Sequence, residues 1–421
     1  HVLRSANVRD VLRCGPEVST GADVALRPTP VAPIRHLARE ASASATTPDL
    51  APDLRKITFT SGTTGMPKGV CITEAMLERV CRDLAGRMHA SSNLGEQLQR
   101  HFALLPLGTL LENVAGVHVP LMLGREVVVR SGRSIGLLGS SRLDPIHLLQ
   151  ALHRDRPDSL ILLPQILQAL VVAAEHGHAP PDSLRFVAVG GAPCGSGLIA
   201  RARALGIPVY EGYGLSECAS VVALNAPGME RTGSVGRVLD SLRVRIVDGG
   251  IQVAGSAFPG YLGQPPAPGG EWLDTGDLGH VDPDGFLFVT GRRKHVMISS
   301  FGRNISPEWL EAELVAAASI AQAMALGDGR PNCAALVVAA RGADRETIAH
   351  DIARINATLP DYARIESFAL ASEPFSVESG CLTDNGRLRR DVIAARHAAE
   401  IAAAFEPYST PSCMEPAHEL L

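Results

Sequence analysis

The sequence predicts an α/β protein. We expect a large N-terminal domain of parallel sheets flanked by helices and a β-subdomain, followed by a small C-terminal α+β domain. Continuous apolar runs alternate with helical segments up to about residue 230, which favours parallel strands covered on both faces. These runs are Phe102–Leu105, Glu126–Val129, Leu160–Leu163 and Phe186–Val189. Short alternating runs separated by Asp-Gly and Pro-Gly turns follow from about 233 to 290, and they favour an antiparallel subdomain.

Composition limits the class of protein. The chain has 421 residues, 46% of them hydrophobic, which is enough for two or three domain cores. A net charge of −5 gives no basic surface for nucleic acid. None of the eight cysteines form C-x-x-C, which is typical of reduced thiols in a cytoplasmic protein. The longest apolar run, residues 160–174, is interrupted by Pro164, Gln165 and Gln168, so we expect no membrane span.

Helix signals divide the chain further. Asp144-Pro145 is a favourable start for a helix through Leu152, and Gly206 suits the end of a helix from Leu198. Ser306-Pro307-Glu308 begins another helix, after which the pattern becomes α+β. We therefore expect domains at 1–293, with the β-subdomain at about 233–293, and at 294–421.

A glycine-rich stretch, residues 60–70 (TSGTTGMPKGV), follows the apolar run Ile57–Phe59 and precedes a predicted helix at Glu74–Met88. The sequence thus predicts a strand-to-helix loop. Its glycines, hydroxyls and Lys68 could surround a phosphate chain. An ordinary flexible loop is the alternative, but hydroxyls and a lysine among the glycines argue against it. A Walker A loop is excluded because Lys68 is followed by Gly69 and Val70, so the Lys-Ser or Lys-Thr pair of that motif is missing.

This stretch resembles the phosphate-loop signature of the adenylate-forming (AMP-binding) superfamily, which includes acyl-CoA synthetases such as fatty-acid–CoA ligases. The resemblance implies an adenylate-forming enzyme fold and a catalytic Lys68. It also implies nucleotide-binding residues at Thr60, Ser61, Gly62, Thr63, Thr64 and Gly65. Members carry a longer segment before this loop, and the chain opens at His1 without an initiator Met, so we expect an N-terminal truncation.

Residues 210–217 (YEGYGLSE) follow a strand-like segment, and strand ends in open parallel sheets are common ligand sites. Tyr213 offers a flat face for a purine, and Glu217 an oxygen ligand for Mg²⁺. Taken alone, the octapeptide could be a turn with an exposed acid. It resembles the family's Y-G-x-T-E motif, which implies nucleotide contacts here and in the Gly-Gly-Ala-Pro segment that resembles the family's adenine-binding turn. The residues implied are Glu211, Gly212, Tyr213, Gly214, Ser216, Gly191, Ala192 and Pro193, with Glu217 as metal ligand.

Four further positions carry resemblances. Asp277 resembles the family's ribose-binding acid, since a carboxylate can accept two hydroxyl donors, and Arg292 resembles a second ribose or phosphate contact. Lys294 stands at the family's hinge position. Residues 299–308 resemble the loop that lines the thiol tunnel, where Gly302 would admit a pantetheine arm. A turn-forming Asp277 and a solvated basic run at residues 292–294 are the alternatives.

Two departures from the family pattern affect catalysis. Residues 105–109 (LPLGT) resemble the acyl site, where relatives often place His and this chain places Thr109. Residues 382–390 (LTDNGRLRR) resemble the C-terminal catalytic loop, whose lysine is replaced here by Arg387. Arginine keeps the charge but replaces a compact ammonium with a planar fork.

The resemblance implies ATP-dependent activation of a carboxylic acid to an acyl-adenylate, with release of pyrophosphate. Transfer to CoA or to phosphopantetheine would follow, with Mg²⁺ as the metal and an acyl-carrier protein as a further partner to test. The apolar segments Leu104–Val119 and Leu160–Ala174 favour a fatty or aryl acid over an amino acid. The alternatives are a carrier-protein loader, an adenylation-weakened homologue, and a non-catalytic module that binds nucleotide or acyl-AMP.

Overall fold

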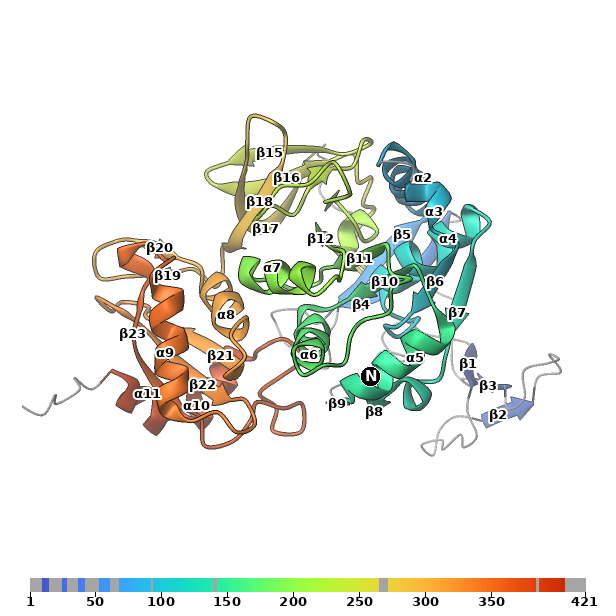
Figure 1. Ribbon diagram of the computed structural model, residues 1–421. Helices are drawn as coiled ribbons and strands as arrows, with labels where there is room; N and C mark the ends of the chain where they lie inside the picture. Colours follow the sequence, from blue (N-terminus) through green and yellow to red (C-terminus); the bar gives the residue numbers. More distant parts are fainter. Residues whose placement is uncertain are drawn as a thin grey trace, which may run out of the picture.

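The computed structural model describes residues 10–14, 25–28, 37–41, 53–60, 68–91, 94–138, 142–264, 272–383 and 386–405, and only the backbone of the first three ranges. The α/β class is confirmed. A large sheet with its helices, a smaller antiparallel sheet and a C-terminal α+β unit surround a central space (Figure 1). Strands β1 (Asp10–Cys14), β3 (Leu37–Ala41) and β2 (Ala25–Pro28) form a separate small sheet.

The large sheet has seven strands. Their spatial order is β14 (Arg237–Val238), β13 (Ala223–Leu224), β12 (Val209–Tyr213), β11 (Phe186–Val189), β10 (Ser159–Leu162), β6 (Arg100–Ala103) and β7 (Glu126–Val129). The five strands from β12 to β7 are parallel, as predicted, and β13 and β14 are antiparallel additions. Parallel strand ends therefore meet at one edge, next to the residues that follow β11 and β12.

Both faces of this sheet are covered. On β11, Phe186 belongs to the core that contains α2 (Glu74–Ala90), whereas its neighbour Val187 belongs to the core with α5, α6 and α7. The bounds of these helices are α5 (Pro145–Asp155), α6 (Pro164–Glu175) and α7 (Ser196–Ala204). The Asp144 carboxylate accepts the amides of Ile146 and His147 at 3.1 Å, which confirms the predicted start of α5.

The predicted strand-to-helix loop is wrong. Strand β4 (Leu54–Thr60) is followed after the loop by a second strand, β5 (Lys68–Thr73), which pairs antiparallel with it, and only then by α2. In the run Val70–Thr73, every residue except Cys71 is β-branched and buried, and such residues favour a strand. Thr73 caps α2 through Met76 N at 3.4 Å, so β5 separates Lys68 from the start of the helix.

The smaller sheet is antiparallel, which confirms the predicted antiparallel subdomain. Its strands are β15 (Arg243–Val247), β16 (Gly250–Ala254), β17 (Trp272–Val281) and β18 (Leu287–Arg292), in that order. Strand β14 also lies within the predicted 233–293 range, but it pairs with β13 in the large sheet. Strands β17 and β18 bring Asp277 and Arg292 into register.

The C-terminal unit has its own cores and its own sheet. Strands β21 (Ile320–Leu326) and β22 (Cys333–Ala339) are antiparallel, and β22 runs parallel to β23 (Ile365–Leu370). Its helices are α8 (Pro307–Val315), α9 (Arg345–Asn356), α10 (Arg390–Arg396) and α11 (Ala398–Ala404). Ser306 caps α8, as predicted. The domain boundary at residues 293 and 294 stays a prediction.

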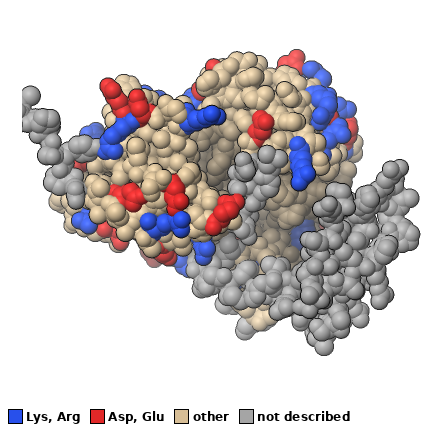
Figure 2. All heavy atoms as spheres, turned by 90° about the horizontal axis from the view of Figure 1, so that it is seen from below, with Lys and Arg blue, Asp and Glu red and all other residues tan. Residues whose placement is uncertain are grey.

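The remaining elements are short. They are α3 (Leu94–Gln97), the π-helix η1 (Glu112–His118), α4 (Val119–Met122), η2 (Gly132–Ile135), β8 (Leu137–Leu138), β9 (Arg142–Leu143), η3 (Ser216–Cys218), β19 (Met297–Ile298), β20 (Asn304–Ile305) and η4 (Asp361–Ala363). Within the described ranges, no helix combines the length and apolar character that crossing a bilayer requires. On the face in Figure 2, acidic and basic side chains are interspersed over two lobes with a hollow between them.

Candidate active site

A cavity of about 3150 Å³ lies between the large sheet, the smaller sheet and the C-terminal unit. It gathers most of the predicted residues that the structure describes. These are Thr60, Lys68, Thr109, Gly191, Ala192, Pro193, Glu211, Gly212, Tyr213, Gly214, Ser216, Glu217, Asp277, Arg292, Lys294 and Arg387. Ser61, Gly62, Thr63, Thr64 and Gly65 lie outside the described residues. Gly302 is exposed in the turn between β19 and β20 and does not line the cavity, so its role stays a prediction.

Asp277 is a buried acid of the cavity with two side-chain partners. Its side chain is only 5% exposed, and its Oδ2 accepts the Tyr213 hydroxyl at 2.6 Å. Its Oδ1 pairs with Arg292 Nε at 2.8 Å. Burial, together with the charge of Asp277 and this hydrogen bond, raises the pKa of Tyr213, so the phenol stays protonated and donates. The carboxylate is therefore fixed at the junction of β12 and β17, with lone pairs left for two further hydroxyl donors.

Glu217 lies in η3, directly after the loop that follows β12. Its Oε1 accepts the Tyr261 hydroxyl at 2.8 Å. The Lys68 ammonium lies 5.2 Å from the centre of the Tyr261 ring, a cation–π distance. Tyr261 is held by the β4–β5 hairpin, because Leu262 N donates to Gly69 O at 2.7 Å. One tyrosine thus links the predicted metal ligand to the predicted catalytic lysine.

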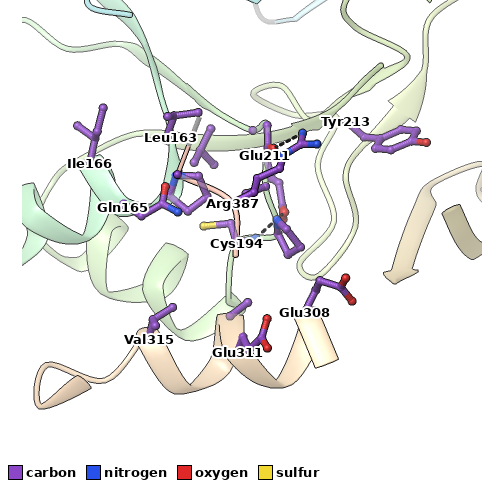
Figure 3. A pocket seen from close by; sticks show the side chains of 18 of the residues that line it. Leu163, Gln165, Ile166, Cys194, Glu211, Tyr213, Glu308, Glu311, Val315 and Arg387 are labelled. Atoms are coloured by element: carbon purple, nitrogen blue, oxygen red, sulfur yellow. Dashed lines mark hydrogen bonds between the residues drawn. The ribbon is translucent and has the colours of Figure 1, made fainter. Parts of the chain in front are cut away.

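Arg387 enters the cavity from the C-terminal unit. Its Nη2 donates to the Gly191 carbonyl at 3.3 Å, in the turn after β11 (Figure 3). Burial and the neighbouring Arg292 lower the pKa of Arg387, while Asp277 raises it. Arginine remains charged when its pKa shifts in this way, so Arg387 places a positive charge next to Gly191, one of the predicted nucleotide-binding residues. Gly191 has φ +83°, a left-handed conformation that favours glycine at this turn.

Glu211, in the middle of β12, lies beside the segment that follows β11 (Figure 3). Its Oε1 accepts the Cys194 amide at 3.3 Å. Burial raises the pKa of Glu211 to about 8, with a further contribution from Glu313. A protonated carboxyl can donate as well as accept, so this position offers hydrogen bonding without a full charge.

The wall near Thr109 differs in character. Between residues 104 and 123, all of them described, the lining is apolar or glycine apart from Thr109 itself. Beneath this wall, the fully buried Glu112 accepts the Leu105 amide at 2.9 Å and lies 3.0 Å from His101 Nε2. His101 in turn meets Ser159 Oγ at 3.1 Å. This buried network joins η1, β6 and β10 and fixes the segment that carries Thr109.

Several residues of the site were missed by sequence reasoning. Tyr261 lies in a loop between β16 and β17, and no local pattern there indicates a contact with Glu217. Glu311 and Arg390 form a bidentate ion pair at 2.6 and 2.7 Å in the C-terminal unit. A possible signal for this pair was the basic run after Arg387, which the sequence reading left without a role.

The residues of the cavity fit Mg²⁺ only if the substrate and water supply some of the ligands of the ion. Within the described ranges, no group of three or more His, Cys, Asp or Glu side chains could hold a metal by itself. Mg²⁺ often uses one or two carboxylates together with substrate phosphates and water. The single carboxylate of Glu217 on the cavity wall is compatible with that arrangement.

Comparison with known proteins identifies the family. Residues 5–262 match the family model described as AMP-binding enzyme, and residues 294–409 match the AMP-binding enzyme C-terminal domain. A long-chain-fatty-acid–CoA ligase (FadD15) of Mycobacterium bovis is 28% identical over 84% of this chain and 69% of its own length. A 2-succinylbenzoate–CoA ligase of Geobacillus sp. is 31% identical over 65% of this chain and 56% of its own.

Solved structures agree with this assignment. The o-succinylbenzoate CoA synthetase of Bacillus subtilis in complex with its acyl-adenylate intermediate matches with a TM-score of 0.63 and 25% identity. The same enzyme with ATP and magnesium ion matches with a TM-score of 0.62 and 25% identity. Each alignment covers 80% of this chain and 68% of that one. The chain therefore belongs to the family of AMP-binding enzymes.

Proposed function

We propose that the cavity residues described above carry out an AMP-forming acid–thiol ligation. The chain is an acid–thiol ligase that activates a carboxylic acid with ATP to an acyl-adenylate and then forms a thioester with CoA. The observation that carries the residue assignment is the meeting of two parts of the chain in one cavity. Asp277, held by Tyr213 and Arg292, lies on one side, and Arg387 enters from the C-terminal unit.

In the first step, a carboxylate oxygen of the acid attacks the α-phosphorus, and the bond to the β-phosphate oxygen breaks as pyrophosphate leaves. Asp277 would accept the two ribose hydroxyls, because its buried carboxylate retains free lone pairs. Arg387 and Lys68, which both line the cavity, would neutralise developing negative charge. Glu217 would hold Mg²⁺, which supplies further charge neutralisation when bound with ATP.

In the second step, the thiol sulfur bonds to the acyl carbon, its proton is lost, and AMP leaves with the electrons of the carbon–oxygen bond. The catalysis asked of this site is positioning and electrostatics rather than covalent chemistry by a side chain. The thiol partner is CoA, and a carrier-protein pantetheine is the further acceptor that we propose to test. The six described cysteines are free thiols, which supports the prediction of a cytoplasmic location.

The acid is proposed to be a fatty or aryl carboxylate. The wall formed by residues 104–123 contributes apolar side chains and Thr109 but no charged group that could hold an amino group. Thr109 can donate a hydrogen bond to the acid without adding charge. An apolar acid gains most from such a wall because its transfer from water is favourable.

Pyrophosphate release is the experiment that tests this function. The protein would be incubated with ATP, Mg²⁺ and a panel of fatty, aryl and amino acids, and then with CoA or a pantetheine-loaded carrier protein. We expect release with one or more apolar acids and thioester with CoA. Binding of ATP without pyrophosphate release for any acid would instead support a non-catalytic nucleotide-binding module.

A further inference from the structure

The C-terminal end of α8 packs on the N-terminal part of the chain. Gly195, the N-cap of α7, lies so close to α8 that an added Cβ would sit 2.6 Å from the Ala312 carbonyl. In Figure 1, α8 lies beside α7, and Figure 3 shows Glu308, Glu311 and Val315 along the helix that borders the cavity. The position of α8 is therefore defined by contact with α7 across the predicted domain boundary.

Two polar side chains hold this end of α8. The last carbonyls of a helix have no donor within the helix and need partners from elsewhere. Gln168 of α6 donates to the Val315 carbonyl, and to the Ile320 carbonyl at 3.3 Å. Arg201 of α7 donates to the Ala316 carbonyl. Both donors come from the N-terminal part of the chain, so the end of α8 is capped by another part of the molecule.

Arg201 is itself held in place. Its guanidinium forms two bonds with Glu175 of α6, at 2.9 and 2.7 Å, so α6 and α7 present the two donors as one unit. A positive group also suits the negative end of a helix dipole. The contact thus favours one orientation of α8 over others in which water would replace these donors.

The same helix is also bonded to the loop that carries Arg387. Glu311 of α8 forms the bidentate ion pair with Arg390, which stands three residues after Arg387. Between them, Arg389 N donates to the Cys381 carbonyl at 2.8 Å and closes the base of the loop. Moving α8 away from α6 and α7 would therefore withdraw Arg387 from the Gly191 carbonyl.

We propose that Gln168 and Arg201 are positioning residues for the adenylation step: by capping α8 from the N-terminal part of the chain, they keep Arg387 in the nucleotide site. This inference rests on the proposed function, because it divides that reaction into two steps. The cap favours the arrangement in which Arg387 is inserted. The proposal requires that thiol transfer from acyl-adenylate proceed without Arg387 at that position.

The test compares the two half-reactions in Gln168→Glu, Arg201→Ala and the parent protein. Gln168→Glu is nearly isosteric, but it replaces a donor with a negative charge facing carbonyl oxygens. We expect pyrophosphate release to slow roughly three- to tenfold in Arg201→Ala, the range for loss of its one hydrogen bond to the Ala316 carbonyl, and by more in Gln168→Glu. Thioester formation from supplied acyl-adenylate should keep the parent rate. Equal slowing of both half-reactions, or no slowing of either, would overturn the inference.

Arg203→Ala is the matched control. Arg203 lies on the same helix as Arg201 and pairs with Glu230 and the Val209 carbonyl, within the N-terminal part. It should leave both half-reactions within about twofold of the parent. If the substitutions acted only by disrupting α7, both half-reactions would slow in Arg203→Ala and in Arg201→Ala alike. The ratio of the rate of pyrophosphate release to the rate of thioester formation therefore distinguishes disruption of α7 from loss of the contact with α8.

A second measurement does not depend on turnover. Fluorescence energy transfer between labels on α5 and α9 would report the interdomain distance in AMP-bound protein. We expect Gln168→Glu to broaden or shift this distance and Arg203→Ala to leave it unchanged. An unchanged distance in Gln168→Glu would overturn the inference. If the parent releases no pyrophosphate with any acid, the proposed function fails, and this distance still decides whether the cap holds the two parts together.

Discussion

Replacing Asp277 by Asn should separate nucleotide binding from folding. The Asp277 side chain is 5% exposed and receives Tyr213 at 2.6 Å and Arg292 at 2.8 Å. The amide keeps the shape but removes the charge and one acceptor oxygen. A hydrogen bond to a charged group contributes about 1.5–3 kcal/mol. Loss of one such bond to the ribose should therefore weaken AMP binding about 10- to 150-fold.

Asn is a cleaner probe than Ala at this position. Asp277→Ala would leave the buried Tyr213 hydroxyl without its acceptor, at a cost of roughly 1–3 kcal/mol in folding stability. In Asp277→Asn, Tyr213 can still pair with the amide, and the half-exposed Arg292 can turn toward water. We therefore expect the free energy of unfolding to change less in the Asn variant than in the Ala variant.

Calorimetric titration with AMP checks this prediction, with urea unfolding of each variant measured in parallel. Asp284→Ala is the control. Asp284 is a 59% exposed acid in the turn between β17 and β18, and its partner is Arg231. Exposed pairs of this kind contribute little, so AMP affinity should not change. If Asp277→Asn binds AMP within twofold of the parent, the ribose does not contact Asp277 and the proposed nucleotide pose is wrong.

Three further predictions follow from the site. Glu217→Gln keeps an acceptor for Tyr261 but removes the charge, so pyrophosphate release should fall sharply and recover partly at raised Mg²⁺. Undiminished release would mean that Glu217 has a structural role and does not bind the metal. Arg387→Ala should abolish acyl-adenylate formation while sparing thiol transfer, whereas Arg387→Lys should equal or exceed the parent; normal adenylation by the Ala variant would remove Arg387 from the mechanism. For Glu211, burial raises the folded-state pKa to about 8 from an ordinary value of 4.5, so the folded protein keeps a proton that the unfolded chain releases. Its contribution to stability is complete below about pH 4.5 and declines as pH rises through 8, and Glu211→Gln should flatten this part of a plot of urea midpoint against pH.

The sequence by itself determined the class of the fold and most of the local elements. Buried parallel strands such as Phe186–Val189 appear as continuous apolar runs because both of their faces are covered. Caps at Asp144 and Ser306 are local hydrogen bonds between near neighbours, so the chain specifies them without long-range information. The motifs around Tyr213, Asp277 and Arg387 also identified residues that line one cavity.

The element that follows the glycine-rich loop could not be predicted from the local sequence. The run Val70–Thr73 is short and mostly apolar. Periodicity alone does not decide whether such a run is a strand or the connection that leads into a helix. Pairing with β4 and the contact of Gly69 with Leu262 make them a strand. Tertiary hydrogen bonds thus override the local reading.

Only the tertiary structure decided which side chains meet across the molecule. Tyr261 is 44 residues from Glu217, and Gln168 is 147 residues from Val315, so neither contact leaves a local pattern in the sequence. The energy of such contacts depends on where whole elements pack, because a hydrogen bond requires its two atoms within about 3 Å. The chain therefore encodes its chemical groups locally, whereas the contact of Gln168 with the Ile320 carbonyl and that of Arg387 with the Gly191 carbonyl exist only in the folded molecule.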